Sequence, residues 1–315
     1  MTDAAAADHV RCATTVPPLT TSLLSYAVAS SRDSSGQSCA WHTVQTTSVG
    51  GGVVPVAIRD DGEIVFLLAK EHHIATWKGS FRWSAFEGGR KWGEDIETAT
   101  MREWHEESLE CVRLECDAAS LRRGEYVLRL VLNTETTRLP RYHVTYVVLV
   151  PYEPHCVTTF AIKRRSILNL RASADILSEA TQACFGTNAK VTDFVVCNVQ
   201  NQIVFHREDS VTVAYEYPYP TSVSTWIAAQ ADLEHALERV RYLCCCEVVR
   251  GVNGRVVDVV VHDEFLEKHR VRWWSVSELR AVLREGGKSK EEQFRAYFMP
   301  VLKELLKFVD DLPCS

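Results

Sequence analysis

The residues with the clearest chemical meaning are a glycine, an arginine and four glutamates at fixed intervals. Five residues separate the glycine from the first glutamate, and seven more precede an Arg-Glu pair, which a pair of glutamates follows two residues later. We call this set the acidic motif: Gly88, Glu94, Arg102, Glu103, Glu106 and Glu107. Carboxylates packed this closely repel one another, and a hard divalent cation with oxygen ligands offsets that repulsion. The motif therefore predicts a site for Mg²⁺ or Mn²⁺.

The last three glutamates of the acidic motif stand at i, i+3 and i+4, so a helix would project them from one face. Glu110, one turn later, extends the row. Before the helix, Gly89 and Gly93 permit a tight loop, and Asp95 places negative charge where the helix dipole favours it. The segment thus predicts a strand, a glycine loop and an acidic helix.

The acidic motif resembles the Nudix box in every charged position and in the intervals between them. The chain departs from the box at two places, Leu109 where the box has glycine and Glu110 where it has an apolar residue. Glycine there usually forms a left-handed helix terminus. Leu109 therefore predicts that the helix runs on toward Cys111 or ends in another way.

The resemblance implies a hydrolase that acts on acid anhydrides in phosphorus-containing compounds. Its expected reaction is metal-dependent pyrophosphohydrolysis of a nucleoside diphosphate linked to another moiety, either a free nucleotide derivative or a capped RNA end. The implied catalytic residues are Glu103, Glu106 and Glu107, which would also bind the metal together with a backbone carbonyl at Gly88. The leaving group is left open.

For the other residues in and around the acidic motif, more than one role is possible. The resemblance gives Arg102 a structural role with Glu94 as its partner, and phosphate binding is the rival. Trp92 and Arg90 are candidates for substrate binding, although core packing is the ordinary fate of tryptophan. The general base is open between Glu103 and an acid and histidine cluster whose members are more commonly solvated. That cluster is His262, Asp263, Glu264, Glu267 and His269.

Hydrophobic patterns around the acidic motif agree with the fold that the resemblance implies, an α/β/α sandwich with a mixed sheet. Apolar runs at 53–58 and 64–68 flank a turn at 60–62 and predict a hairpin. Ser275 and Glu278 form a capping box that predicts a helix after a closing strand. Further strands are expected at 83–86, 126–132, 142–150 and 271–274.

The chain divides into four predicted parts. They are a flexible N-terminal segment at 1–50, the first part of the core at 51–152 with the catalytic box at 88–110, an insertion at 153–268, and the closing strand with C-terminal helices at 269–315.

The insertion is large, and we expect it to lie over the substrate cleft. Within it, helices are predicted at 163–171 and 231–243, and strands at 194–205, 211–217, 248–249 and 256–261. Its basic run of Lys163, Arg164 and Arg165, with Arg171 beyond, is more typical of a solvated helix face than of a phosphate-binding surface.

Composition limits the partners. The formal net charge of −6 argues against a broad nucleic-acid surface, so RNA is possible as a partner without being indicated. No apolar stretch has the length of a membrane span, and no membrane association is predicted. The eleven cysteines are odd in number and include the run Cys244, Cys245 and Cys246, which indicates free thiols in a reducing compartment. We expect an intracellular, cytoplasmic protein; mitochondrial and nuclear addresses and the oligomeric state are left open.

A second interpretation belongs to another functional class. The chain would be a catalytically weak or inactive Nudix scaffold that serves as a nucleotide-binding, RNA-binding or regulatory protein. Leu109 and the large insertion favour this alternative, whereas the complete set of glutamates favours the enzyme.

Overall fold

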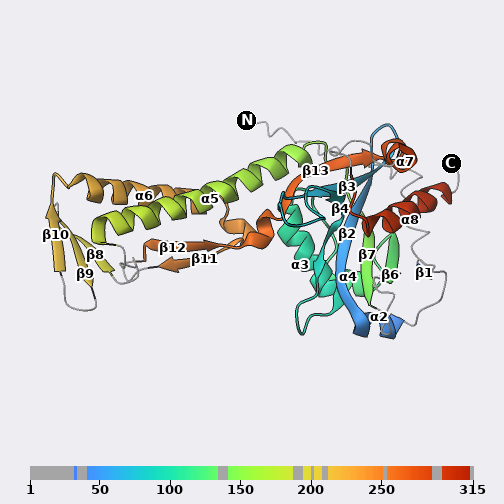
Figure 1. Ribbon diagram of the computed structural model, residues 1–315, viewed down its shortest axis with the longest axis horizontal. Helices are drawn as coiled ribbons and strands as arrows, with labels where there is room; N and C mark the ends of the chain where they lie inside the picture. Colours follow the sequence, from blue (N-terminus) through green and yellow to red (C-terminus); the bar gives the residue numbers. More distant parts are fainter. Residues whose placement is uncertain are drawn as a thin grey trace, which may run out of the picture.

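The chain forms a core built on a mixed sheet, and a long arm projects from it (Figure 1). The computed structural model describes residues 32–33, 41–133, 141–186, 194–199, 202–207, 212–250, 254–285 and 293–312. Helices cover both faces of the core sheet, so the predicted α/β fold class with a mixed sheet is confirmed.

The core sheet has the strand order β1-β6-β7-β2-β3-β13. Its central strand β2 (Ser48–Ile58) runs parallel to β7 (Tyr142–Leu149) and antiparallel to β3 (Ile64–Glu71). The closing strand β13 (Lys268–Ser275) pairs with β3, which brings a segment from far along the chain beside the first hairpin. The other strands are β1 (Arg32–Asp33), β4 (Trp83–Ser84), β5 (Phe86–Gly89) and β6 (Leu128–Asn133).

Alternating side chains of the strands supply two hydrophobic cores. On β3, Val65 and Leu67 face one core, and Phe66 and Leu68 face the other. Each such side chain contributes roughly 1.5–3 kcal/mol when it is fully buried. The first core is covered by α3 (Ile96–Ser108) and α4 (Ala118–Arg122), and the second by α7 (Val276–Glu285) and α8 (Phe298–Asp310).

Helix α3 carries the glutamates of the acidic motif, and local signals set both of its ends. Asp95 is the N-cap, because its carboxylate accepts a hydrogen bond of 2.7 Å from the N–H of Thr98. The helix ends at Ser108, and Leu109 follows in the left-handed region with φ 52° and ψ 28°. Leu109 is fully buried, so this leucine takes the backbone conformation that glycine usually takes at a helix terminus.

The arm consists of two long helices and two small sheets (Figure 1). Helix α5 (Cys156–Phe185) contains the predicted helix at 163–171, and α6 (Thr221–Glu238) begins ten residues before the predicted start at 231 and ends at 238 rather than 243. The predicted strand at 194–205 is two strands in the structure. The strands of the arm are β8 (Phe194–Val199), β9 (Gln202–Arg207), β10 (Thr212–Glu216), β11 (Cys246–Arg250) and β12 (Val256–Val261).

The insertion was expected to lie over the substrate cleft, but the arm that it forms does not fold over the core. It extends away from the sheet, and only its base reaches α3 and β13 (Figure 1). Lys163 donates a hydrogen bond of 3.0 Å to the carbonyl of Glu110, and His105 lies 3.0 Å from the carbonyl of Leu243. The two helices bury their apolar stripes mainly against each other and β12, which explains why the arm can leave the core.

Residues 41–50 were assigned to the flexible N-terminal segment, but they form α2 (Trp41–Thr47) and the start of β2. Residues 1–31 and 34–40 of that predicted segment lie outside the described residues. The glycines at the start of β2 have a packing role, because a Cβ on Gly51 would lie 2.2 Å from Oγ1 of Thr100 on α3. A small side chain at this position lets the helix rest directly on the strand.

Two further expectations concern membranes and thiols. Among the described residues, none of the helices has the length and hydropathy needed to cross a bilayer. Seven cysteines within that part of the chain are free thiols, of which Cys111, Cys156 and Cys245 are buried and Cys244 is exposed.

Candidate functional site

The glycine loop and helix α3 meet at Gly88 and Glu103. A Cβ built on Gly88 would lie 2.2 Å from Cδ of Glu103 and 2.3 Å from both of its carboxylate oxygens. Any larger residue would expel this carboxylate from its position. The glycine of the acidic motif is therefore explained by the close approach of Glu103. A Cβ built on Gly50 of β2 would lie 2.4 Å from the carbonyl oxygen of Gly88.

Arg102 ties the loop to the helix. Its Nε donates to one oxygen of Glu94 at 2.8 Å, and its Nη2 donates to the carbonyl of Gly89 at 2.8 Å and to the second oxygen of Glu94 at 3.1 Å. Its Nη1 donates to Glu103 and to Glu106, both at 2.8 Å. The planar guanidinium has several N–H donors, so it can contact the loop and the helix at the same time. This position agrees with a structural role for Arg102.

Glu107 occupies a different environment, deep beneath the other two glutamates. It is 2% exposed, and one oxygen accepts a hydrogen bond of 2.6 Å from the N–H of Glu87. Its other oxygen lies 3.0 Å from Nζ of Lys268, which is 1% exposed, and the two side chains form a buried ion pair. Both oxygens of Glu107 are thus engaged by the protein.

Lys268 also connects the acidic motif to a buried carboxylate on β3. Its Nζ lies 2.7 Å from Glu71, whose same oxygen accepts hydrogen bonds from Ser84 at 2.8 Å and from Arg295 at 2.9 Å. Tyr297 donates a hydrogen bond to Glu87. The site therefore includes residues from β3, β5, β13 and the segment before α8, in addition to α3.

The carboxylates outnumber the cationic groups that neutralise them. Burial raises the pKa of Glu103, Arg102 opposes this rise, and the charges of Glu106 and Glu267 add to it. Burial also raises the pKa of Glu107 well above its ordinary value, although Lys268 opposes the rise. Burial, which disfavours the charged form, is thus the largest cause of both raised pKa values, whereas the pKa values of Glu71 and Glu94 are lowered by their cationic partners. The carboxylates are Glu71, Glu87, Glu94, Glu103, Glu106 and Glu107, and the cations are Lys91, Arg102, Lys268 and Arg295.

The donor set fits a divalent cation in ligand type and charge. Glu103 and Glu106 offer hard oxygen donors within the excess of negative charge, and each is 8% exposed. Within the described residues, no three His, Cys, Asp or Glu side chains are arranged around a common metal position. Arg102 donates a hydrogen bond to one oxygen of each of these two glutamates.

For the two candidates for substrate binding, no contact with the glutamates of the acidic motif is found among the described residues. Arg90 donates from Nη1 to the carbonyl of Gln45 at 2.8 Å, so it ties the loop to α2. Trp92 is completely exposed on the same loop. Of the candidate bases near the end of the insertion, Glu267 is close enough to raise the pKa of Glu103, whereas Asp263 pairs with Arg171 on the arm.

The buried charged residues outside the acidic motif were not predicted from the sequence. Lys70 and Glu71 continue the apolar run of β3, and Lys268 lies at the predicted edge of the insertion. One sequence feature could have indicated these residues: a charged residue directly after an apolar strand. A lysine or glutamate at such a position is almost never fully buried unless it has a partner, so it predicts a buried ion pair. Their partners come from segments far apart in the sequence.

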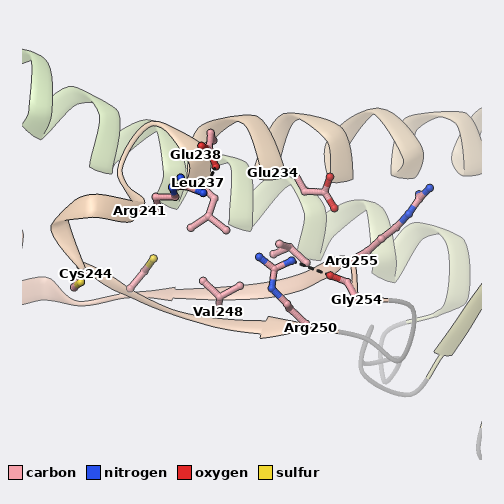
Figure 2. Close-up of a pocket in the computed structure, with 11 residues that line it drawn as sticks. Glu234, Leu237, Glu238, Arg241, Cys244, Val248, Arg250, Gly254 and Arg255 are labelled. Carbon is pink, nitrogen blue, oxygen red and sulfur yellow. Dashed lines mark hydrogen bonds and ion pairs between the residues drawn. The ribbon is translucent and has the colours of Figure 1, made fainter.

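A separate cavity of about 730 Å³ lies in the arm, between α6 and the β11–β12 hairpin (Figure 2). Leu237 and Val248 form part of its wall, and Arg241 pairs with Glu238 at 3.4 Å. Arg250 donates to the carbonyl of Gly254 at 2.8 Å. None of the residues that line this cavity belongs to the acidic motif.

No protein-family model matches the chain, and no curated protein matches it in sequence. Solved structures with local likeness include a Nudix hydrolase from M. smegmatis, RenU, at 16% identity over 34% of this chain and 63% of that chain, with a TM-score of 0.25. The C. elegans Ap4A hydrolase matches at 21% identity over 33% of this chain and 70% of its own, with a TM-score of 0.23. A bifunctional NMN adenylyltransferase/ADP ribose pyrophosphatase from Francisella tularensis, complexed with AMP and a Mn ion, matches at 15% identity over 34% and 29%, with a TM-score of 0.23. Likeness at this level assigns no activity.

Proposed function

We propose that the chain is a Nudix-type, metal-dependent pyrophosphohydrolase that cleaves a diphosphate linkage in a nucleoside diphosphate derivative. The observation that carries the proposal is the joint position of Gly88, Arg102, Glu103 and Glu106, which have the spacing of the Nudix box and converge in space. In the reaction, the oxygen of water bonds to one phosphorus and the bridging P–O bond breaks, which leaves two phosphate products.

A bound Mg²⁺ or Mn²⁺ would neutralise phosphate oxygens and lower the pKa of the attacking water. Glu103 and Glu106 would hold it, since they are the most accessible carboxylates of the acidic motif on α3. Glu107 was also predicted as a ligand, and it would have to exchange Lys268 for the ion. Arg102 keeps Glu94 and the Gly89 carbonyl in place, so the loop stays against the helix.

The test is a panel of nucleoside diphosphate derivatives, capped RNA included, assayed with and without Mg²⁺ or Mn²⁺. We expect turnover that requires metal, and we expect Glu106→Gln to remove most of it. Glu110→Gln is the matched control, because Glu110 lies just beyond the end of α3 and contacts His105 instead of the cluster. Absence of turnover on every compound would overturn the enzyme assignment.

The scaffold alternative has one observation in its favour, the ion pair between Lys268 and Glu107. A lysine in this position supplies a permanent positive charge where a catalytic site would use a metal. The alternative expects nucleotide binding that chelation of divalent ions does not change, together with no turnover. Calorimetric titration with and without a chelator separates the two functions.

A further inference from the structure

Helix α5 of the arm has one face that packs against the protein and one that faces solvent. Its buried side chains, which include Ile167, Leu170 and Leu177, belong to the first hydrophobic core. On the opposite face, the large apolar side chains of Leu168 and Ile176 are 38% and 54% exposed. Helix α6, every residue of which the structure describes, exposes no large apolar side chain. Helix α5 therefore differs from an ordinary surface helix, whose outer face is polar.

The exposed residues of α5 form a stripe that is centred on Ala172. Leu168 and Ile176 lie four residues before and after it, and Arg165 and Glu179 lie seven residues before and after it. A further alanine lies eleven residues away on either side. Steps of four and seven residues return to the same face of a helix. We call this set the outer stripe, and all of its members are exposed: Ala161, Arg165, Leu168, Ala172, Ile176, Glu179 and Ala183.

The outer stripe is complementary to a second copy of itself. If a second α5 ran antiparallel about Ala172, Leu168 of one copy would face Ile176 of the other. Arg165 would face Glu179, and two-fold symmetry would form each contact twice. Ala172 would meet its own counterpart, where a small side chain lets the two backbones approach closely. A parallel pair would instead place like charges opposite each other, which is unfavourable.

The two charged residues of the outer stripe are available for such a partner. Within the described part of the chain, neither Arg165 nor Glu179 forms an ion pair. Arg171, on a neighbouring face of the same helix, pairs with Asp263. An exposed ion pair contributes little free energy, so these two charges would set the direction of the pairing more than its strength.

The core leaves the outer stripe open to a partner. The base of α5 reaches the core through other faces, because Lys163 donates to the carbonyl of Glu110 and Arg164 donates to the carbonyl of Lys268. The arm projects away from the core sheet (Figure 1), so an antiparallel partner would carry its own core at the far end of the paired helices. At 1.5 Å per residue, the two copies of Cys156 would be about 48 Å apart along the helix axis.

We propose that the outer stripe of α5 is the contact surface of a symmetric, antiparallel dimer of this chain. The partner is a second copy because the outer stripe matches itself in both charge and size. The contact is one helix wide, which puts it at the weak end of protein interfaces, and we expect monomer and dimer to exchange at micromolar concentrations. The inference is independent of the proposed hydrolase activity.

Sedimentation equilibrium of the full chain over a range of concentrations measures this association. We expect Arg165→Glu to raise the dissociation constant at least about tenfold, because both ends of the contact would then hold two negative charges. Glu179→Arg should have a similar effect, with two positive charges at each end. Asp232→Arg is the matched control, since it makes the same change of charge at an exposed position of α6. Its dissociation constant should equal that of the wild type.

A mixture of the two single variants separates a lost contact from a folding defect. In an antiparallel pair, each glutamate of the Arg165→Glu chain faces an arginine of the Glu179→Arg chain. The mixture should therefore associate with a dissociation constant within about threefold of the wild-type value. The double variant Arg165→Glu/Glu179→Arg should recover association with itself, because the exchange of charges restores both ion pairs.

Three results would overturn the inference. A wild-type chain that stays monomeric up to about 100 µM would leave the outer stripe to a different partner. A dimer that both single variants retain would have its interface elsewhere, or its α5 helices parallel, since a parallel pair holds like charges in the wild type and in each single variant. Association that is lost in the single variants and recovered neither in the mixture nor in the double variant would contradict the pairing of Arg165 with Glu179.

Discussion

Lys268 and Glu107 form an ion pair of 3.0 Å in the interior of the core, and both side chains are 1% exposed. The lysine comes from the closing strand β13 and the glutamate from helix α3, so the pair joins segments separated by the whole arm. Since Glu71 lies 2.7 Å from the same Nζ, one lysine serves two buried carboxylates. This arrangement makes the closing strand part of the site.

Lys268→Met should lower the free energy of unfolding by about 3–5 kcal/mol, because removal of one partner leaves buried charge without compensation. Glu71 keeps Arg295 at 2.9 Å, so the loss falls mainly on Glu107. Combining Lys268→Met with Glu107→Gln should therefore recover part of the loss. Urea unfolding of the four members of this cycle measures the coupling, and additive effects would show that the two side chains do not interact.

Arg102→Lys should reduce both stability and turnover. One ammonium group cannot reach Glu94, Glu103, Glu106 and the carbonyl of Gly89 together, whereas the guanidinium contacts all four. We expect kcat/KM on an active panel compound to fall by at least about tenfold, together with a lower urea midpoint. Arg113→Lys is the control, because Arg113 is 81% exposed and lies 3.8 Å from Glu115. Equal behaviour of the two variants would refute the structural role of Arg102.

Asp95→Ala should cost about 1 kcal/mol at pH 7 through loss of the N-cap of α3. Burial alone would raise the pKa of Asp95, but the hydrogen bond from Thr98 and the charge of Arg122 lower it overall. A lowered folded-state pKa means that the ionised carboxylate stabilises the fold above the unfolded pKa of about 3.9, and that this contribution is lost as pH falls through the folded value.

The difference in the free energy of unfolding between the wild type and Asp95→Ala should therefore be constant from pH 7 to pH 5 and should shrink below about pH 4. Asp95→Ser keeps a capping oxygen without a titrating group, so at pH 7 its free energy of unfolding should lie closer to that of the wild type than the value for Asp95→Ala does. Urea midpoints across this range test the assignment. A deficit of Asp95→Ala that stays constant down to pH 3 would contradict it.

Leu109→Gly should destabilise the protein even though glycine is the usual residue for its backbone conformation. A left-handed residue other than glycine costs roughly 1–2 kcal/mol, whereas loss of a fully buried leucine costs about 2–5 kcal/mol. Leu109→Ala loses almost the same burial and keeps the strained conformation. The glycine variant should thus be the more stable of the two by about 1 kcal/mol in urea unfolding. The reverse order would show that packing alone governs this position.

The acidic motif and the period of the hydrophobic pattern were readable from the sequence. Both depend on residues close together along the chain, so spacing was sufficient to place the glutamates on one helix and β2 and β3 in a hairpin. The start of β2 was missed, because glycines at 50–52 are typical of loops unless a helix packs directly on them. The arm was recognised as extra sequence, but its direction depends on packing between α5 and α6.

The sequence by itself determined the charge, the spacing of the glutamates and the fold class, since these follow from local residue order. Only the tertiary structure decided which charges share an environment. Lys268 meets Glu71 because β13 pairs with β3. Arg164 contacts the carbonyl of Lys268 because the arm helix α5 packs against β13. Such contacts depend on the register between distant strands, and a strand shifted by one residue would turn Lys268 to the other face of the sheet.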